Sequence, residues 1–378
     1  MARRVLYIHG IGEIGGAERD LLAMLGMLDR AEWEPHVACP SEGPFQSVIR
    51  QAGISAHPLA LTPWRKWYSL FVRWRGVARL RALLTQLQPA LVHVNDIWWV
   101  PHTIEALGEA PVRRIPLVAH VRQEIEPDKV RRYGLDRVDS VIAISRQVEE
   151  ALAAGGVAAG RLQTIYSGLD YSPPPRADDV RESICRTLGL PADAVLLGTV
   201  ANVFPRKGYD IMIRALPGIL EAVPTAHYLI VGTEETGYAG SLLTLARKLR
   251  VLDHVHMVGF QDPVRPYLAS LDLYVHPALL EGFGIAVVEA MAAGKAVVAT
   301  RTGGLPEVVE HERTGLLVAP GDPDQLSAAI LSLLRDATRR EQMGSRGAAR
   351  VRKQFDLKAS VAAIEQLYRT VLGTPRTR

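Results

Sequence analysis

The stretch Glu281-Gly-Phe-Gly-Ile-Ala-Val-Val-Glu289-Ala-Met-Ala-Ala-Gly-Lys-Ala-Val-Val-Ala299 places two carboxylates eight positions apart, with a Gly-Phe-Gly turn between them. The small residues after the turn predict a helix that packs closely on a sheet, and Gly294 fits the end of that helix. Glu281 is then expected in the loop before the helix and Glu289 one to two turns inside it. The free N–H groups and positive dipole end of such a helix form an anion site, and the acidic groups beside it suit sugar hydroxyls. The alternative is a capped helix with one solvated glutamate.

The composition of the 378-residue chain is that of a soluble globular protein with two domains. Hydrophobic residues make up 48% and charged residues 22%, and the net charge is +4. Cys39 and Cys185 lie far apart, which argues against a disulfide scaffold or a zinc cluster and indicates a reducing, cytoplasmic environment. No apolar stretch approaches the roughly 20 residues of a membrane-spanning helix. The apolar run that ends at Gly10 is too short for a signal peptide.

Buried strands and helices alternate along the first half of the chain. Short apolar runs predict strands at residues 5–8, 36–39, 91–94, 117–121 and 140–144, and helical spacing predicts helices at 19–28 and 146–154. Ser145 is a good N-cap for the second of these helices. Strands that alternate with helices favour a parallel sheet that is covered on both faces.

A proline-rich segment interrupts this alternation. Three consecutive prolines and polar residues at 171–179 predict a linker. A second series follows, with strands at 195–200, 227–231, 255–258, 273–276 and 297–299, helices at 209–220 and 242–250, and a helix capped by Asp322. The predicted architecture is α/β, with two doubly wound domains that face a cleft where the carboxyl ends of both sheets place ligand loops.

Glycines near the N-terminus admit two interpretations. Gly10-Ile-Gly-Glu-Ile-Gly15 has the G-x-G-x-x-G pattern of a dinucleotide site, which alone is a weak signal. Such a site also needs an acidic residue at the end of the second strand, and Cys39-Pro40 occupies that position. We therefore favour Gly15-Gly16 at a helix start, where backbone N–H groups can reach a phosphate. A tight turn without a ligand is the alternative.

Polar residues follow two of the predicted strands. His120 ends an apolar strand, so it is either a core histidine or a functional group at the ligand edge of the sheet. The loop from Asn202 to Gly208 contains Arg206 and Lys207, and two cations in such a loop can balance a diphosphate leaving group. A solvated basic loop is the alternative.

Residues 64–81 are both basic and aromatic. On a helix, one apolar face would consist of Trp67, Leu70, Phe71, Trp74 and Val77, with Arg65, Arg73, Arg75 and Arg79 mostly away from it. This pattern is typical of a helix on an anionic membrane surface, here the inner face of the cytoplasmic membrane. A domain helix with an apolar core face explains the pattern equally well. Nothing else in the chain supports nucleic-acid binding.

Several landmarks occur in the order of one known family. The Glu281–Glu289 stretch is followed by Thr302-Gly-Gly-Leu-Pro-Glu-Val-Val309 and Thr314-Gly-Leu-Leu-Val318, and preceded by Gly15-Gly-Ala-Glu18 and Val141-Ile-Ala-Ile-Ser145. With these landmarks the chain resembles the GT4 family of retaining glycosyltransferases over nearly its whole length. The resemblance implies a GT-B fold of two Rossmann-like domains, 1–172 on the acceptor side and 173–355 on the donor side. It also implies that a C-terminal helix, at about 356–378, joins the first domain.

The resemblance implies roles for the residues of the Glu281–Glu289 stretch. Glu281 would bind hydroxyls of the transferred sugar, and Glu289 would bind the ribose. Backbone groups of Phe283, Gly284 and Ile285 would contact the sugar and the phosphates. The donor would be a nucleotide sugar, used as a substrate, and no metal or cofactor is expected.

Residues outside this stretch would complete the site. From the first domain, Gly15-Gly16 would approach the diphosphate and His120 would contact the sugar near the reacting carbon. Lys207 would neutralise the departing diphosphate. The family often has arginine at the position of Asn202, and Arg206 is the residue that could supply this charge.

These features together predict a retaining glycosyltransferase that moves a sugar from a UDP or GDP sugar to a hydroxyl of a glycan, lipid or small-molecule acceptor. Lys207, Arg206 and the helix start would stabilise the negative charge that develops on the diphosphate. Three alternatives stay open at this point. They are a nucleotide-sugar epimerase of the same fold, a nicotinamide-dependent oxidoreductase, and a subunit that binds a sugar nucleotide without turnover.

Overall fold

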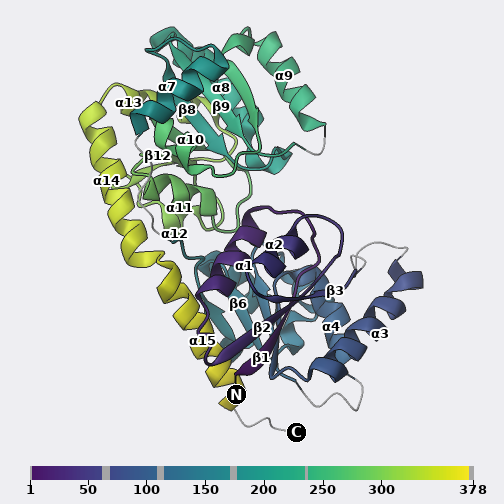
Figure 1. The fold of residues 1–378 in the computed structure, drawn as a ribbon. Coiled ribbons are helices and arrows are strands. Elements are labelled where there is room, and N and C mark those ends of the chain that lie inside the picture. Colours follow the sequence, from purple (N-terminus) through teal and green to yellow (C-terminus); the bar gives the residue numbers. More distant parts are fainter. Residues whose placement is uncertain (1, 62–68, 109–114, 171–176, 235–236, 374–378) are drawn as a thin grey trace. The chain divides into compact units, whose positions relative to one another are not determined.

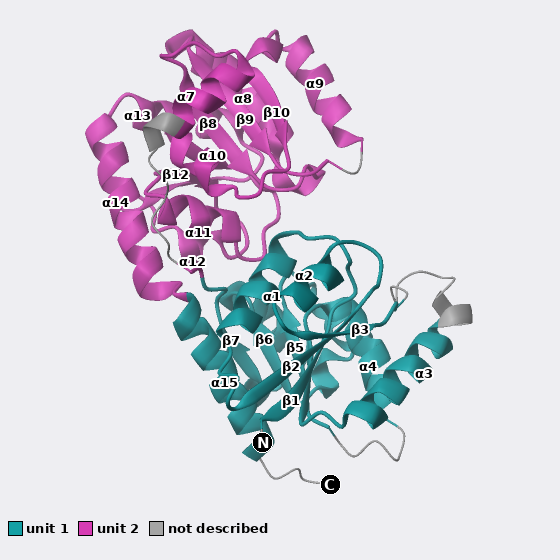
Figure 2. Cartoon of the chain, in the orientation of Figure 1, with its two compact units in different colours: residues 1–168, 357–378 teal, residues 169–356 magenta. Residues whose placement is uncertain are grey.

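The chain divides into two compact units. The computed structural model describes residues 2–61, 69–108, 115–170, 177–234 and 237–373 (Figure 1). Unit 1 consists of residues 1–168 and 357–378, and unit 2 consists of residues 169–356 (Figure 2). Most of the predicted proline-rich linker, residues 171–176, lies outside the described residues.

Unit 1 contains a parallel sheet with the strand order β3-β2-β1-β4-β5-β6-β7. Its strands are β1 (Arg3–Ile8), β2 (Trp33–Cys39), β3 (Ser55–Pro58), β4 (Leu91–Val94), β5 (Leu117–Val121), β6 (Ser140–Ala143) and β7 (Leu162–Thr164). Its helices are α1 (Gly16–Met27), α2 (Phe45–Gln51), α3 (Ser69–Leu87), α4 (Val100–Leu107), α5 (Pro127–Arg132), α6 (Arg146–Ala154) and α15 (Leu357–Gly373), with short 3-10 turns η1 (Ile97–Trp99), η2 (Leu135–Arg137) and η3 (Ala159–Arg161).

Both faces of the central strands of this sheet are buried. In β1, Val5 and Tyr7 belong to a core that includes residues of α1, α2 and α15. The alternate residues Leu6 and Ile8 are fully buried as well, on the opposite face. Every residue of β4, β5 and β6 is also buried. Cover on both faces explains why these strands are continuous apolar runs in the sequence.

The C-terminal helix α15 is part of the core of unit 1, and Figure 2 draws it in the colour of that unit. Tyr368 on this helix is fully buried, and its hydroxyl lies 3.1 Å from the hydroxyl of Tyr7 and 2.6 Å from Nδ1 of His93. Arg369 forms an ion pair with Glu32 at 2.6 Å. The C-terminal helix α15 therefore contacts both β1 and β4 through Tyr368.

Unit 2 contains a second parallel sheet, with the strand order β10-β9-β8-β11-β12-β13. Its strands are β8 (Val195–Val200), β9 (Ala226–Val231), β10 (Val255–Gly259), β11 (Leu273–His276), β12 (Val297–Thr300) and β13 (Gly315–Val318). Its helices are α7 (Ala177–Leu188), α8 (Tyr209–Ala222), α9 (Tyr238–Lys248), α10 (Arg265–Ser270), α11 (Ile285–Ala292), α12 (Leu305–Val308), α13 (Pro323–Leu334) and α14 (Ala337–Gln354), with turns η4 (Pro205–Lys207) and η5 (Leu252–His254).

The predicted α/β architecture with two doubly wound units is confirmed. Local signals also hold: Ser145 accepts the N–H of Val148 at 3.3 Å as the N-cap of α6, and Asp322 caps α13. Gly294 has φ of +73° just after α11, which is the left-handed conformation that ends helices. The structure adds three strands that the sequence pattern did not identify, namely β3, β7 and β13.

Candidate active site

The strand order of the sheet in unit 2 reverses between β8 and β11. Sheets of this type bind ligands at such a reversal, outside the carboxyl ends of the strands. The loop after β8 carries Arg206 and Lys207, and the loop after β11 carries Glu281. Residues that are distant in sequence therefore meet at one edge of the sheet.

Backbone contacts hold these two loops together. The carbonyl oxygen of Arg206 accepts hydrogen bonds from the N–H groups of Leu279 (2.8 Å) and Leu280 (3.2 Å). Gly208 has φ of +69°, and a Cβ at this position would lie 1.9 Å from the carbonyl oxygen of Pro277. Glycine satisfies both the left-handed backbone and the close approach. The spacing of the two loops is therefore fixed before any ligand binds.

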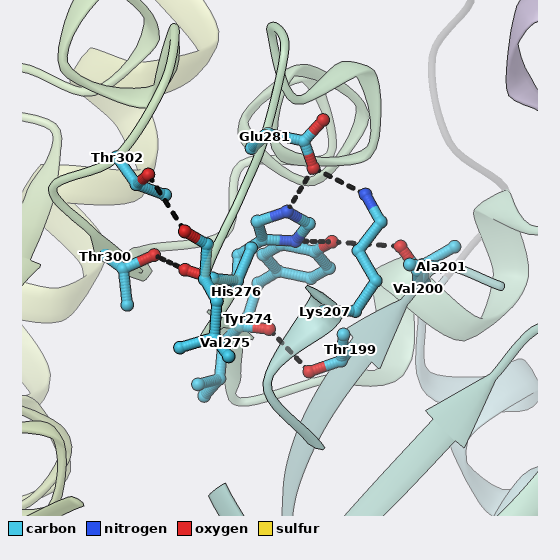
Figure 3. A network of polar contacts seen from close by, with 12 residues as sticks. Thr199, Val200, Ala201, Lys207, Tyr274, Val275, His276, Glu281, Thr300 and Thr302 are labelled. Atoms are coloured by element: carbon cyan, nitrogen blue, oxygen red, sulfur yellow. Dashed lines mark hydrogen bonds and ion pairs between the residues drawn. The ribbon is translucent and has the colours of Figure 1, made fainter. Parts of the chain in front are cut away.

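The side chain of Glu281 is the centre of a polar network (Figure 3). Its Oε2 atom accepts hydrogen bonds from Nζ of Lys207 at 2.6 Å and from Nε2 of His276 at 2.8 Å. The side chains of Lys207 and Glu281 are only 13% and 12% exposed. Burial alone would raise the pKa of Glu281, but Lys207 and His276 together outweigh burial and hold that pKa well below its usual range. Glu281 is therefore an ionised carboxylate, and no described residue donates to its Oε1 atom.

His276 is a residue of this network that the sequence analysis missed. It ends β11, its side chain is 1% exposed, and its Nδ1 atom lies 3.2 Å from the hydroxyl of Tyr274. Burial lowers the pKa of His276 more than Glu281 raises it, so the imidazole is neutral at neutral pH and donates through Nε2. His276 thus orients Glu281 without adding a charge. A histidine at the carboxyl end of an apolar strand, the signal used for His120, could have identified it.

Arg206 and Asn202 lie outside the direct contacts of Glu281. The side chain of Arg206 is exposed, but its charge helps to lower the pKa of His276 and so acts on the site. Asn202 is half-buried, and its carbonyl oxygen accepts the N–H of Phe204 at 3.0 Å. Among the described residues, no hydrogen bond joins the Asn202 side chain to Glu281. The structure therefore brings Lys207 and Glu281 into contact and leaves the Arg206 side chain exposed, without a direct contact to Glu281.

Helix α11 begins beside this network. Gly284 is its N-cap with φ of +97°, and Glu289 lies in its second turn, as predicted. The Phe283 ring is buried against Phe355, with ring centroids 5.5 Å apart. The Phe283 side chain is therefore part of the core. The groups that a ligand can reach here are backbone N–H groups at the helix start, including that of Ile285.

In unit 1, the predicted phosphate loop forms the start of α1. Gly15 is the N-cap and Gly16 is the first helical residue. The carboxylate of Glu18 folds back on this start, because Oε2 accepts the N–H of Gly15 at 2.9 Å and Oε1 lies 2.8 Å from Nε2 of His9. The N–H of Gly15 is therefore engaged within the chain. Nothing lies within 4 Å of a Cβ built on Gly16, so this position is the more open of the two.

The other glycines of the G-x-G-x-x-G pattern have packing roles. A Cβ at Gly10 would lie 1.9 Å from the ring of Trp99. A Cβ at Gly12 would lie 1.8 Å from the carbonyl oxygen of Glu42. These two positions need glycine for close approach, so the pattern requires no dinucleotide to explain it.

His120 lies in β5, is 3% exposed, and has no hydrogen-bond partner for either ring nitrogen among the described residues. Its ring lies 5.5 Å from that of His93, which contacts the Tyr368 hydroxyl. Burial lowers the pKa of His93 to about 3 and that of His120 well below its usual value. Both rings are therefore neutral polar groups.

These buried histidines predict that unit 1 loses stability in acid. When folding lowers the pKa of a histidine, the unfolded state binds more protons below pH 6.5, so stability falls as the pH drops. For His93, with its pKa lowered from 6.5 to about 3, the loss between pH 7.5 and 5 is about 2 kcal/mol. In His93→Gln the amide oxygen can still accept the hydrogen bond from Tyr368. We expect the free energy of unfolding of this variant, measured with urea, to fall by about 2 kcal/mol less than that of the wild type between pH 7.5 and pH 5.

Comparing the wild type with His93→Gln separates the effect of His93 on the pH dependence of stability from the effects of other titrating groups. Asp96, for example, has a pKa raised to about 6 by burial, which gives a change of opposite sign as the pH falls. This contribution is present in both proteins and cancels in the difference. Equal losses of unfolding free energy in wild type and variant would show that His93 is not held neutral by burial.

Two family models match the chain. One, described as glycosyl transferases group 1, matches residues 180–350, and the other, described as Glycosyltransferase Family 4, matches residues 14–172. The chain belongs to the GT4 family of nucleotide-sugar-dependent glycosyltransferases. The resemblance drawn from the Glu281–Glu289 stretch is thereby confirmed.

Relatives of this GT4 chain include transferases that are named for different substrates. D-inositol 3-phosphate glycosyltransferase 2 of Catenulispora acidiphila is 32% identical over 292 residues, 72% of this chain and 66% of the relative. A GDP-mannose-dependent alpha-(1-6)-phosphatidylinositol monomannoside mannosyltransferase of Mycobacterium tuberculosis is 33% identical over 238 residues, 60% of each chain. The alignments thus span about two thirds or less of the length of these relatives.

A solved structure supports the fold of the GT4 chain. Anabaena HepE, in complex with UDP-glucose, superposes with a TM-score of 0.86 over 97% of this chain and 100% of that chain, at 24% identity. The predicted GT-B fold is therefore confirmed.

The basic and aromatic segment of the GT4 chain differs from its prediction. Residues 64–68, including Trp67, lie outside the described residues. In α3, Val77 is 3% exposed and continues into a buried stripe with Leu80 and Leu84, whereas Trp74 is 59% exposed. Trp74 and Val77 are three positions apart and so neighbour one another on the helix surface, but Val77 packs in the core stripe whereas Trp74 is exposed, so the predicted apolar face is divided between core and surface.

Among the described residues of the GT4 chain, no helix is long and apolar enough to cross a membrane. The same residues include no group of three or more His, Cys, Asp or Glu side chains that could hold a metal ion.

Proposed function

We propose that this GT4 protein is a retaining glycosyltransferase that moves a hexose from a UDP or GDP sugar to a hydroxyl of a glycan, lipid or small-molecule acceptor. The observation that carries the proposal is the pairing of Lys207 with Glu281 at the strand reversal of unit 2, beside the start of α11. A cation, a helix start and a carboxylate fit the diphosphate and the sugar of such a donor. The relative named for GDP-mannose and the structure solved with UDP-glucose support the same class of donor.

Lys207 would exchange its partner when the donor binds. Negative charge develops on the diphosphate as the bond from the sugar to the phosphate breaks. Lys207, the exposed Arg206 and the N–H groups at the start of α11 would stabilise that charge. Glu281 would keep the hydrogen bond from His276, so its carboxylate would not become a buried charge without a donor. The Glu281 carboxylate, held by His276, can then accept hydrogen bonds from hydroxyls of the transferred sugar.

Attack on the same face of the sugar accounts for retention. The low pKa of Glu281 makes its carboxylate a weak base and a poor nucleophile. A phosphate oxygen of the departing diphosphate would instead take the proton of the acceptor hydroxyl as the new glycosidic bond forms. Glu281 would then act by positioning and electrostatics.

Other residues would complete the donor contacts. Glu289, in the second turn of α11, would bind the ribose, and backbone groups of Phe283, Gly284 and Ile285 would meet the phosphates. Gly16 would approach the diphosphate and His120 the reacting carbon. A neutral His120 suits contact with a sugar hydroxyl, because it adds no charge near the forming oxocarbenium-like centre.

Thermal unfolding with candidate donors tests this proposal. A ligand at a hundred times its dissociation constant stabilises a protein by about 2.7 kcal/mol. We expect UDP-glucose or GDP-mannose to raise the Tm of the wild type, and NAD to leave it unchanged. The double variant Lys207→Met/Glu281→Gln should lose the shift. A panel of UDP and GDP sugars without any shift would rule out the proposed donor.

The exposed end of α3 is the part of the chain that we propose for contact with an anionic membrane, where a lipid acceptor would be found. Trp74 is 59% exposed, the guanidinium of Arg75 lies 5.1 Å from its ring centroid, and Arg75 and Arg79 are exposed. Each arginine near an anionic surface contributes about 1 kcal/mol. We expect Arg75→Gln/Arg79→Gln to weaken co-sedimentation with phosphatidylglycerol vesicles about 30-fold, with Arg247→Gln on α9 as the control. Equal recovery of the wild type on phosphatidylcholine vesicles would contradict the surface.

A further inference from the structure

The amino ends of strands β8, β11 and β12 meet at one edge of the sheet in unit 2. These strands are neighbours and parallel, so this edge is opposite to their carboxyl ends, where the candidate active site lies. Tyr274 of β11 pairs in register with Val297 of β12. Asp272 and Lys295 each lie two residues before this pair, so they precede the two strands side by side. Charged groups from distant parts of the chain therefore meet here, away from the candidate active site.

Asp272 already has its partners at this edge. Its Oδ2 atom accepts from Nη2 of Arg181 on α7 at 2.9 Å and from the N–H of Leu196 at 2.7 Å. The same guanidinium donates to the carbonyl oxygens of Ser270 at 2.7 Å and of Ala194. The charge of Asp272 is therefore balanced by Arg181 within the unit.

Lys295 has no such partner. It is half-buried, and its Nζ atom makes no hydrogen bond or ion pair with any described residue. Burial lowers the pKa of Lys295, and Arg181 and Arg340 lower it as well, against the opposite effect of Asp272. Nothing lies within 4 Å of a Cβ built on the neighbouring Gly294, so there is open space beside the lysine. The N–H groups of this ammonium are available to a ligand.

Arg340 on α14 brings a further cation to this edge. Its Nη1 atom donates to the carbonyl oxygens of Leu333 at 3.0 Å and Leu334 at 3.4 Å, in the last turn of α13. Its Nε and Nη2 atoms make no hydrogen bond with any described residue. One turn further along α14, a Cβ on Gly344 would lie 2.0 Å from the carbonyl oxygen of Gly294. This close approach packs α14 against the loop that carries Lys295.

These four groups, here called the basic cluster of unit 2, are Arg181, Lys295, Arg340 and Asp272. They include three cations and one carboxylate, so their net charge is +2. Cations that lie close together in a partly buried place repel one another. A ligand with about two negative charges would remove this repulsion and accept the hydrogen bonds that Lys295 and Arg340 do not make within the chain.

We infer that the basic cluster of unit 2 binds a phosphate group, as inorganic phosphate or as the phosphate of a small soluble ester, with Lys295 and Arg340 as its donors. A phosphate monoester carries a charge of about −1.5 to −2 at pH 7 and three acceptor oxygens. This charge matches that of the cluster, whereas a carboxylate has a single charge. The planar guanidinium of Arg340 fits two phosphate oxygens, and the ammonium of Lys295 acts as a point charge. The site lies within unit 2 and does not depend on the proposed transfer reaction.

NMR of the full chain with 13C-labelled lysine tests the site. The chain has seven lysines, so few ε-CH2 signals occur, and Lys295→Met identifies the signal of Lys295. We expect inorganic phosphate to shift this signal to saturation at constant ionic strength, and to leave the signal of Lys248 on α9 unchanged. Lys207 gives its own signal, so phosphate at the proposed donor site is observed separately. Titration with glycerol 3-phosphate distinguishes an ester from free phosphate, because the ligand that the site holds binds more tightly.

Two substitutions on α14 measure the contribution of the arginine. Arg340→Gln removes the charge and keeps an amide that can donate to the carbonyl oxygen of Leu333. We expect the Kd of phosphate, followed by the signal of Lys295, to rise at least about tenfold in this variant. Arg346→Gln, an exposed arginine on the same helix, is the matched control and should keep the Kd of the wild type.

Substitutions of Lys295 separate binding from a purely structural role. We expect phosphate to raise the Tm of the wild type and of Lys295→Arg, which keeps the charge, by similar amounts, and that of Lys295→Met by less. Phosphate at Lys207 contributes equally to all three proteins and cancels in the comparison. A structural lysine would change the Tm without phosphate and leave the increase with phosphate unaltered.

Three outcomes would overturn the inference. They are a Lys295 signal that neither phosphate compound shifts, a shift that sodium chloride reproduces at the same ionic strength, and an equal increase of Tm with phosphate in the wild type and Lys295→Met. A Lys207 signal that responds to UDP while the Lys295 signal ignores both phosphate compounds would contradict the basic cluster as a binding site and leave the proposed donor site in place.

Discussion

Replacing Lys207 by methionine is expected to lower kcat by about two to three orders of magnitude. Methionine keeps most of the length of the side chain and removes the charge. The ammonium group lies 2.6 Å from Glu281 and belongs to a side chain that is only 13% exposed, beside the start of α11. Without it, the diphosphate would leave with less stabilisation of its developing charge. Initial rates of transfer at saturating donor would measure the effect.

Loss of stability must be separated from loss of chemistry in this variant. Lys207→Met leaves Glu281 with His276 as its remaining donor, and breaking a buried ion pair costs about 3–5 kcal/mol. In Lys207→Met/Glu281→Gln both charges are absent, so stability should return toward that of the wild type while kcat stays low. Lys248→Met, on the exposed end of α9, is the matched control. Near wild-type rates in a folded Lys207→Met protein would remove Lys207 from the proposed mechanism.

Most of the fold was predictable because parallel strands buried on both faces leave continuous apolar runs. Leu117–Val121 and Leu273–His276 are examples, and both are buried throughout. The edge strand β3, Ser55–Pro58, could not be found in this way. Its residues are exposed or half-buried, and pairing with β2 is what makes it a strand. β7 has only three residues, which is too short for any pattern to develop.

The site was predictable where residue type and strand position coincide, as for Lys207 and Glu281. His276 was missed because a histidine inside an apolar run resembles a core residue, and its partner Glu281 lies in the following loop. The contact of Tyr368 with His93 joins positions 275 residues apart, so no local pattern contains it. The exposure of Trp74 was not predictable, because tertiary packing covers the neighbouring stripe of Val77, Leu80 and Leu84 and leaves Trp74 uncovered.

Gly284→Ala is expected to destabilise unit 2 by about 2–5 kcal/mol and to abolish the thermal shift with the donor. Gly284 has φ of +97°, and a Cβ here would lie 2.6 Å from Cδ2 of Leu305. Leu305 is fully buried and cannot move aside without displacing its neighbours. The substitution must therefore shift the start of α11, which lies beside Glu281. Urea unfolding and donor thermal shifts would measure the two effects.

Gly294→Ala, at the other end of α11, is a matched control that separates backbone strain from the clash. Gly294 also has a positive φ, +73°, but nothing lies within 4 Å of a Cβ built there. It should therefore cost only the backbone term of about 1–2 kcal/mol and leave donor binding intact. If the two variants lost equal stability, Leu305 would be able to adjust, and the start of α11 would not be rigid. If Gly284→Ala bound donors as tightly as Gly294→Ala, the start of α11 could not be where the diphosphate binds, and the stabilisation of the leaving group would have to come from Lys207 and Arg206 alone.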